Sequence, residues 1–549
     1  MKGNGKYPDK IMEKSIDPTV HAMLARAEEL GIDTAWDRYE AMIPQCGFGE
    51  LGLCCRHCNM GPCRISPFEG EGPKQGICGA TADIIVARGL LRMIAAGAAA
   101  HSDHGRDIAH TLLLTAEGKS GGYQIKDEAK LKALAQEYGI KVDKRSTEEI
   151  ALDLARAAYA EFGKQEGPVQ FTRRAPEKRL ALWKQVGIDP RGVDREIVEV
   201  MHRTHIGVDN DPVNLILHGL RTAIADGWGG SMIATELSDV LFGTPKPVKS
   251  EANLGVLKQD QVNIIVHGHE PTLSEMIVTA AQDPDMVALA KKYGAKGINV
   301  AGICCTGNEI LMRHGIPVAG NFLQQELALI TGAVEAMIVD VQCIFPALGA
   351  VAGCFHTKLI STSPKAKFPG ATHIEFHEEH ALTTAKEIVR TAVENYRFRK
   401  PGQVNIPAEK TACMVGFSAE AILATLGGSP KPLIDAIANG SIRGIAGVVG
   451  CNNPKIKHDY GHITMLEELI KQNVLVVTTG CNAIAAAKAG LLLPEAAEKA
   501  GAGLQAVCQA LGIPPVLHMG SCVDISRILT VCAVIAKELG VDISDLPVA

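Results

Sequence analysis

The sequence predicts a multidomain α plus α/β protein, in which a helical region is followed by two α/β regions with parallel sheets. Residues 1–240 are rich in Ala, Leu, Glu and Lys, and their apolar residues return at helical spacing. From about residue 255, short β-branched runs appear, each closed by Gly, Pro or Asn and followed by a helical pattern. A segment with Pro and Lys near 400–411 divides these runs into two series. We therefore expect domains at residues 1–240, 241–405 and 406–549.

Eight β-branched runs define the two α/β regions. They lie at residues 262–266, 298–303, 336–342, 357–361, 412–416, 444–449, 474–478 and 515–519. Strands that alternate with helices form parallel sheets, because the chain crosses back through a helix between successive strands. In an open parallel sheet, functional sites form beyond the carboxyl ends of the strands. Residues that directly follow these runs are therefore the first candidates for a site.

Bulk composition restricts the function classes. The 549-residue chain has a formal net charge of −6 and no run of five Lys or Arg residues, so we expect no nucleic-acid partner. Residues 1–14 lack the apolar core of a signal peptide. The most apolar stretches, such as 341–355, are shorter than the roughly 20 residues that a membrane span needs. We expect a cytoplasmic protein with 16 cysteines, of which the clustered ones bind metal rather than form disulfides.

A dense group of cysteines lies between residues 46 and 78. A cubane iron–sulfur cluster needs four thiolates, which a loop with Gly and Pro can wrap around it. The four that fit this spacing are Cys55, Cys58, Cys63 and Cys78. A structural zinc site is the alternative for the same four ligands.

Cys46 and Cys54 remain after these four are assigned. Two thiolates complete no cubane within one chain. A two-fold dimer presents the same pair twice, however, and so supplies four ligands across its axis. This predicts an isologous homodimer with a shared cluster, and the alternative is a pair of free or disulfide-bonded cysteines.

Six soft or borderline ligands follow six of the predicted strands, three in each α/β region. They are His269, Cys305, Cys343, Cys451, Cys481 and Cys522. One imidazole and five thiolates exceed what a zinc ion needs and suit a multi-metal sulfide cluster between the two regions. On position alone, His267 competes with His269 and Cys304 competes with Cys305. We interpret the remaining cysteines as core thiols, namely Cys354, Cys413, Cys508 and Cys532.

A row of ionisable residues follows the helical pattern of residues 101–110. The residues that recur at every third position are His101, His104, Asp107 and His110. On a helix, successive members of this row step along the axis by about 4.5 Å. Histidine titrates near neutral pH, so the row suits a proton relay. A solvated polar face is the alternative interpretation of the same spacing.

Seven short segments contain most of these residues. They are CGFGELGLCCRHCNMGPCRISPF at 46–68, VHGHEP at 266–271, GICCTGNE at 302–309, DVQCIFP at 340–346, GVVGCNNPK at 447–455, TTGCNA at 478–483 and HMGSCVDISR at 518–527. With these segments, the chain from about residue 40 onward resembles the nickel-containing carbon monoxide dehydrogenase family of the prismane/hybrid-cluster superfamily. The resemblance implies a helical domain followed by two Rossmann-like parallel-sheet domains.

The resemblance also implies roles for individual residues. An intrachain [4Fe-4S] cluster matches Cys55, Cys58, Cys63 and Cys78, and a [4Fe-4S] or [2Fe-2S] cluster shared at the dimer axis matches Cys46 and Cys54. The ligands of a nickel–iron–sulfur cluster match His269, Cys305, Cys343, Cys451, Cys481 and Cys522. His101 matches an active-site acid/base, and Asp226 resembles an acidic residue near the cluster. The family often has histidine where Asp107 stands, which leaves the third step of the relay open.

The implied reaction interconverts CO and water with CO2, two protons and two electrons. The electrons pass through the clusters to ferredoxin or a similar carrier, and an acetyl-CoA synthase or a hydrogenase is a further implied partner. A hydroxylamine reductase of the hybrid-cluster type and a non-catalytic redox protein are the alternatives. The family continues past the position of Ala549 through a segment with a catalytic lysine. We therefore expect a C-terminally truncated chain that assembles its clusters but oxidises CO poorly.

Overall fold

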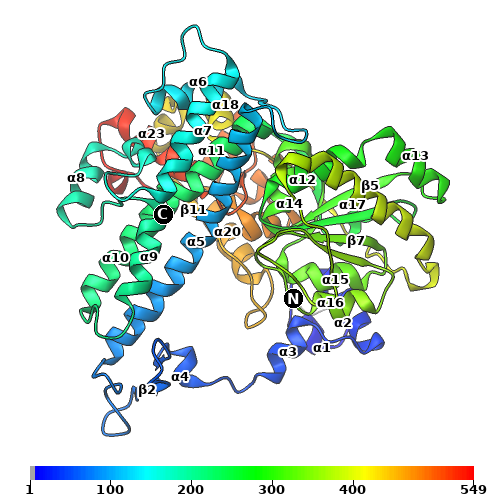
Figure 1. The fold of residues 1–549 in the computed structure, drawn as a ribbon, viewed down its shortest axis with the longest axis horizontal. Helices are drawn as coiled ribbons and strands as arrows, with labels where there is room; N and C mark the ends of the chain where they lie inside the picture. The colour runs from blue at the N-terminus through cyan, green and yellow to red at the C-terminus, as the bar shows by residue number, and fades with distance from the viewer. Residues whose placement is uncertain (1–6) are drawn as a thin grey trace.

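The computed structural model describes residues 7–549 and has a helical region beside two α/β regions (Figure 1). Residues 1–6, the beginning of the segment in which we expected no signal peptide, lie outside the described residues. The helical region and the larger sheet lie on opposite sides of Figure 1, and the orange ribbon of the C-terminal region is seen between them.

The helical region is organised around its longest helix, α5 (Ala82–Ala116). This helix packs against α7 (Thr147–Gly163), α9 (Val193–Arg203), α10 (Pro212–Ala225) and α11 (Ser231–Phe242). The region also contains α6 (Glu128–Glu137) and α8 (Glu177–Gln185). With 35 residues, α5 is by length and composition the one helix among the described residues that could cross a membrane, although we had expected no stretch of that length. One such helix is weak evidence for a membrane span, because the long core helix of a globular protein can have the same length and composition.

The first helices of the chain pack on the larger sheet, although their sequence position groups them with the helical region. They are α1 (Asp9–Met12), α2 (Pro18–Leu30) and α3 (Ala35–Ala41). Val20 and Trp36 are buried there in a core that also contains Ile265 and Leu327. The chain then reaches the short helix α4 (Gly47–Glu50) and a hairpin of β1 (Cys54–Cys55) and β2 (Cys63–Arg64), which project from one end of α5 (Figure 1).

An eight-stranded sheet forms the first α/β region. Its strands are β3 (Val248–Ala252), β4 (Val262–Gly268), β5 (Ile298–Ile303), β6 (Val318–Gly320), β7 (Val334–Val339), β8 (Lys358–Ser361), β9 (Thr372–His373) and β10 (Thr411–Val415). The order is β10-β3-β6-β5-β4-β7-β8-β9, and only the β10–β3 pair is antiparallel. Its helices are α12 (Pro271–Ala281), α13 (Pro284–Lys292), α14 (Cys304–His314), α15 (Gln325–Ile330), α16 (Leu348–Gly353) and α17 (Ala381–Asn395).

A three-stranded parallel sheet forms the second α/β region, in the order β11 (Gly444–Val448), β12 (Val474–Thr479) and β13 (Val516–Gly520). Its helices are α18 (Ala419–Thr425), α19 (Lys431–Ala438), α20 (Tyr460–Lys471), α21 (Gly480–Lys488), α22 (Ala502–Leu511) and α23 (Ile525–Leu539). The last residues also lie along β11, where the Ile445 N–H donates to the Pro547 carbonyl at 3.0 Å.

All eight predicted runs form strands, which confirms them as β4, β5, β7, β8, β10, β11, β12 and β13. Strands β3, β6 and β9 were not predicted. Two of them have only three and two residues, and β3 carries Lys and Glu in a run that is not β-branched. Strand β10 follows the linker near 400–411, yet it completes the edge of the first sheet instead of beginning the second.

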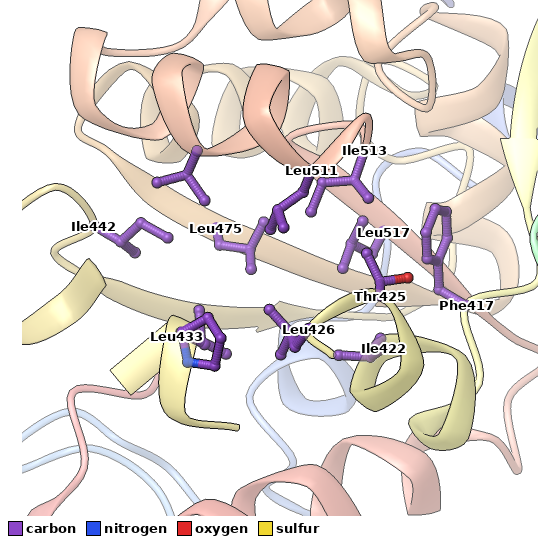
Figure 2. A pocket seen from close by; sticks show the side chains of 12 residues that line it. Phe417, Ile422, Thr425, Leu426, Leu433, Ile442, Leu475, Leu511, Ile513 and Leu517 are labelled. Atoms are coloured by element: carbon purple, nitrogen blue, oxygen red, sulfur yellow. The ribbon is translucent and has the colours of Figure 1, made fainter. Parts of the chain in front are cut away.

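An apolar cavity of about 30 Å³ lies between the smaller sheet and helices α18, α19 and α22 (Figure 2). Aliphatic side chains and Phe417 line it, and the hydroxyl of Thr425 on its wall donates to the Ala421 carbonyl at 2.8 Å. A buried water needs two to four polar partners. The cavity therefore offers neither a water site nor a catalytic group.

Candidate metal centre at the strand ends

The six predicted strand-end ligands lie at the carboxyl ends of six parallel strands. Adjacent strands β4, β5 and β7 of the larger sheet are followed by His269, Cys305 and Cys343. Strands β11, β12 and β13 of the smaller sheet are followed by Cys451, Cys481 and Cys522. The carboxyl ends of parallel strands meet at one edge, so each sheet brings three of these residues together.

The two sets of residues meet at the junction of the sheets. The Sγ atom of Cys305 lies 3.0 Å from Sγ of Cys522, and the Cys522 N–H donates to the Cys305 sulfur at 3.3 Å. On the side of the larger sheet, Nε2 of His269 lies 3.9 Å from Sγ of Cys343. All of these cysteines are free thiols. One imidazole and several thiols from distant parts of the chain therefore converge on one place.

Cys304 is a further member of this group, although its position made it only a competitor of Cys305. The ligand atoms of His269, Cys304 and Cys305 all lie within 4.8 Å of one another. After the Cys305 thiol, those of Cys343 and Cys481, one from each α/β region, also raise the pKa of the Cys304 thiol, so Cys304 lies near ligands of both regions. Cys304 thus lies among the candidate ligands, and the paired cysteines of CCTG were the signal for it.

Charge is divided unequally among the thiols. The pKa of Cys481 is lowered, first by its hydrogen bond with Cys304 and then by one with Cys451, and the pKa of Cys451 is raised in return. The pKa of Cys305 is likewise lowered, first by the Cys304 thiol. A hydrogen bond with Cys304 also lowers the pKa of Cys343 to about 6. Thiolates are the metal-binding form of cysteine, so the lowered pKa values of Cys305, Cys343 and Cys481 favour binding of metal cations.

The two histidines of the VHGHEP segment have different surroundings. His269 is buried and faces Cys343, as described above. Nε2 of His267 instead lies 3.1 Å from Oε1 of Gln325, and burial lowers the pKa of His267 to about 4. The geometry therefore favours His269 as the imidazole that faces the thiols.

A buried carboxylate, Asp340, holds the turn that carries His269. Its oxygens accept hydrogen bonds from the N–H groups of His269 at 2.8 Å and Glu270 at 3.1 Å, and from the Thr306 hydroxyl at 3.0 Å. A Cβ on Gly268, whose φ is 145°, would overlap the Asp340 carboxylate. Burial raises the pKa of Asp340 to about 6. In the sequence, the signal for this acid is its place directly after a buried strand.

Unusual backbone conformations occur at the cysteine-bearing turns. Cys304, Gln342 and Cys343 have φ values of 65°, 62° and 57°, in the left-handed region that residues with a Cβ rarely adopt. Two side-chain amides hold these turns. Asn308 donates to the Cys304 carbonyl at 3.0 Å, and Gln325 donates to the Cys343 carbonyl at 2.9 Å. Strained backbone that is held in this way concentrates at functional sites.

His101 and Asp226 lie together where α5 meets a π-helical turn, Asp226–Gly230. Nδ1 of His101 lies 2.8 Å from Oδ1 of Asp226, which also accepts a hydrogen bond from the Ser231 hydroxyl at 2.7 Å. The approach of the two segments needs glycine, because a Cβ on Gly105 would come within 2.5 Å of the Gly230 carbonyl oxygen. The structure therefore joins two residues that the sequence separates by more than 100 positions.

The electrostatic surroundings of His101 connect it with the thiols. Burial lowers the pKa of His101, but the Asp226 carboxylate outweighs burial, and the net pKa is raised. His269 and Cys305 also affect this pKa, which places His101 close to the candidate metal centre. Such a histidine beside a carboxylate suits proton transfer at that centre.

The rest of the histidine row continues along α5 without forming a continuous hydrogen-bonded chain. His104 is buried, its Nε2 has no hydrogen-bond partner among residues 7–549, and burial lowers its pKa to about 3. The Asp107 carboxylate forms an ion pair of 2.6 Å with Lys365, a residue that the sequence did not indicate. His110 lies beside the ring of Tyr159, with the ring centroids 6.5 Å apart.

The N-terminal cysteines are divided into two groups. One small pocket beside the β1–β2 hairpin is lined by Cys55, Cys58, Cys63 and Cys78. Cys46 is exposed at the start of α4, Cys54 is half-buried, and neither lines the pocket. This arrangement has the four-plus-two division that the spacing predicts.

Residues 53–549, which contain both α/β regions and the pocket with four cysteines, match the Prismane/CO dehydrogenase family. The chain belongs to this family. Among curated members, it is 70% identical over 544 residues to carbon monoxide dehydrogenase 1 of Methanosarcina mazei, covering 99% of this chain and 86% of that protein. It is 53% identical over 553 residues to carbon monoxide dehydrogenase 1 of Carboxydothermus hydrogenoformans, covering 97% and 86%.

Solved structures of the family have the same fold. A nickel-free carbon monoxide dehydrogenase from Thermococcus sp. AM4 has a TM-score of 0.97 at 58% identity, covering 100% of this chain and 87% of that one. A structure of acetyl-CoA synthase/carbon monoxide dehydrogenase has a TM-score of 0.95 at 46% identity, covering 98% and 82%. These likenesses confirm the fold class that the sequence predicts, a helical region with parallel-sheet α/β regions.

The donor set at the strand ends fits a nickel–iron–sulfur cluster. The converging atoms are thiol sulfurs and an imidazole nitrogen, which select soft and borderline metals over magnesium or calcium. At least six cysteines reach this place when Cys304 is counted, more than one tetrahedral ion can use. The chemistry of the site therefore agrees with the cofactors of the family.

Proposed function

We propose that the chain interconverts CO and water with CO2, two protons and two electrons. The observation that carries the proposal is the convergence of His269 and Cys305 from the larger sheet with Cys522 from the smaller one. The residues that would hold a nickel–iron–sulfur cluster are His269, Cys305, Cys343, Cys451, Cys481 and Cys522. When bound, this cluster supplies metal activation of water and accepts electrons.

In this proposal, His101 transfers protons and Asp226 supports it. Nδ1 of His101 faces the Asp226 carboxylate at 2.8 Å, so Nε2 is the nitrogen that takes up a proton during CO oxidation. The carboxylate orients the ring and stabilises its protonated form. Protons then leave along α5 in the direction of Asp107, whose carboxylate is bound to Lys365.

The electrons leave through the N-terminal cysteines of a homodimer. The pocket of Cys55, Cys58, Cys63 and Cys78 would hold one [4Fe-4S] cluster, and Cys46 and Cys54 would share a [4Fe-4S] or [2Fe-2S] cluster with a second copy. Large apolar side chains near the second pair support an interface there. Met42 is 65% exposed, Ile43 is 56% exposed and Leu51 is 59% exposed.

The external partner is an electron carrier of the ferredoxin type. A Moorella thermoacetica relative that is 46% identical over 557 residues is named a subunit of carbon monoxide dehydrogenase/acetyl-CoA synthase, which supports a synthase as a further partner. A hydrogenase is the other candidate acceptor. Free thiols at every cysteine position agree with a reducing, cytoplasmic location.

The test is CO-dependent reduction of a viologen dye by the purified chain after loading with iron, sulfide and nickel. We expect CO-dependent dye reduction above the background rate, together with one nickel and about ten irons per chain, since two chains would share the cluster at the axis. A chain that binds iron but no nickel and reduces hydroxylamine would instead be a hydroxylamine reductase. Iron without either activity would indicate a redox protein without turnover.

A further inference from the structure

A buried guanidinium lies beside the four N-terminal cysteines. Arg88, on α5, lines the same pocket as Cys55, Cys58, Cys63 and Cys78, and only 2% of its surface is exposed. Among the described residues 7–549, it is the only permanently charged residue in the lining of this pocket. The other basic residue there is His57, and burial lowers its pKa.

Within residues 7–549, the Nε donor of Arg88 has no hydrogen-bond acceptor, and its positive charge has no carboxylate partner. Nη2 donates to Oδ1 of Asn210 at 2.7 Å and to the main-chain oxygen of Asp209 at 3.4 Å. Nε is buried and has no hydrogen-bond partner, and within residues 7–549 the guanidinium forms no ion pair with a carboxylate. Buried arginines are normally paired, because an uncompensated buried charge is strongly destabilising. The pocket should therefore hold an anionic group.

We propose that Nε of Arg88 donates a hydrogen bond to a sulfur of the [4Fe-4S] cluster held by the four cysteines, and that the guanidinium raises the reduction potential of this cluster. The inference rests on the proposed function, because it takes the pocket as a cluster site. One-electron reduction adds one negative charge to the cluster. A fixed cation stabilises this reduced form more than the oxidised form, and hydrogen bonds to the sulfurs act in the same direction.

Asn210 anchors the Arg88 guanidinium beside the four cysteines. The anchor on Asn210 fixes the guanidinium plane, so Nε keeps its direction when the cluster changes charge. Arg88 would thus set how readily electrons from the strand-end site enter the N-terminal clusters.

The test measures the one-electron midpoint potential of this cluster in the nickel-loaded holoenzyme, by EPR during titration with dithionite, which supplies the electron. The signal that disappears in Cys63→Ser identifies the cluster. Arg88→Met removes the charge and keeps the bulk of the side chain. The matched control is Arg92→Met, one turn along α5, where the half-buried guanidinium donates to the Thr204 hydroxyl at 2.8 Å.

We expect Arg88→Met to disfavour reduction about tenfold, which makes the midpoint about 59 mV more negative for one electron. Arg88→Lys should restore part of this shift, because it keeps the charge but lacks the planar donor. Arg92→Met should shift the equilibrium less than about threefold, because Arg92 does not line the pocket of the four cysteines.

Equal midpoints in the wild type and Arg88→Met, at equal iron content, would overturn the inference, and so would an equal shift in Arg92→Met. If the Arg88→Met variant does not bind the cluster, the midpoint is measured in Asn210→Ala instead, because this variant removes the acceptor that anchors Nη2 of Arg88. A more negative midpoint in that variant supports the role of Arg88, and an unchanged midpoint overturns it. A wild-type holoenzyme without the Cys63-dependent signal would instead refute the cluster assignment on which the proposed function relies.

Discussion

The two cysteine sites of this chain are built in opposite ways. The N-terminal site takes Cys55, Cys58, Cys63 and Cys78 from one short stretch of chain, at a hairpin that projects from one end of α5 (Figure 1). The strand-end site takes its residues from positions 269 to 522, at the ends of strands in two different sheets. The first depends on local chain geometry, whereas the second exists only when both sheets have formed and docked.

One buried carboxylate, Asp239 on α11, joins helices of all three regions. Arg527 on α23 binds it through two nitrogens at 2.8 Å, Arg313 on α14 binds it at 2.9 Å and Lys130 on α6 binds it at 2.8 Å. Helices from the helical region and from both α/β regions therefore meet at this side chain. The strand-end site should be sensitive to changes far from its ligands, and the N-terminal site should not.

The largest expected effect separates the two sites directly. Cys305→Ser removes the thiol that lies 3.0 Å from Cys522 and within 4.8 Å of the His269 and Cys304 ligand atoms. We expect CO oxidation to fall more than about 100-fold, because loss of even an outer-shell partner of a metal ligand costs about 10–100-fold. CO-dependent dye reduction measures this loss, and the EPR signal of the N-terminal cluster should persist. The exposed Cys354→Ser variant is the control, and the same loss in both variants would contradict the assignment.

The second change tests the dependence on docking. Asp239→Asn leaves three buried cations with a neutral partner and should lower the free energy of unfolding by about 3–5 kcal/mol in urea titrations. Burial alone would raise the pKa of Asp239, but Arg527 and Lys130 outweigh it and lower the pKa. Its contribution should therefore be present above about pH 4, the unfolded value, and be lost as the pH falls towards the lower folded value. A variant with wild-type stability across this range would show that the sheets dock by other contacts.

The third change tests proton transfer and leaves both metal sites assembled. His101→Asn should reduce turnover about 100-fold without changing the nickel or iron content, because it removes only proton transfer. Asp226→Asn should move the acidic limb of the pH–rate profile to lower pH, since the carboxylate raises the pKa of His101. A profile that stays in place in Asp226→Asn would contradict the role of this pair.

The smallest effect on the strand-end site is expected from a change in the pair Cys46 and Cys54, which two copies would share. Cys46→Ser should lower the iron content by about two per chain and weaken dimerisation, as measured by iron analysis and analytical ultracentrifugation. The pocket of four cysteines and the strand-end site should keep their metals. Full iron content in this variant would argue against a cluster shared between two copies.

The strand-end site could be predicted in outline because its ligands have fixed places in the sequence pattern. Strands β4, β5, β7, β11, β12 and β13 are β-branched runs, and a ligand follows each of them. The supporting residues could not be predicted in the same way. Asp340 and Gln325 act on backbone groups of other segments, and those contacts appear only when the segments are adjacent in the fold.

The packing neighbours of α2 and β10 could not be predicted for a related reason. Helix α2 is amphipathic, but its sequence does not indicate which apolar surface its apolar face packs against. In the structure this helix packs against α15 of the first α/β region. Strand β10 has the composition of any other strand, and its antiparallel pairing with β3 depends on the route of the linker before it. Periodicity therefore predicts the elements, whereas long-range packing decides their neighbours.

We infer that the strand ends hold the nickel. Anomalous scattering from crystals of the metal-loaded chain, recorded at the nickel absorption edge, tests it most directly. We expect one nickel peak per chain at the junction of Cys305 and Cys522, with iron peaks beside it, and no nickel peak at the pocket of Cys55 and Cys63. A nickel peak at the N-terminal cysteines, or none at the strand ends of a chain that oxidises CO, would contradict the account.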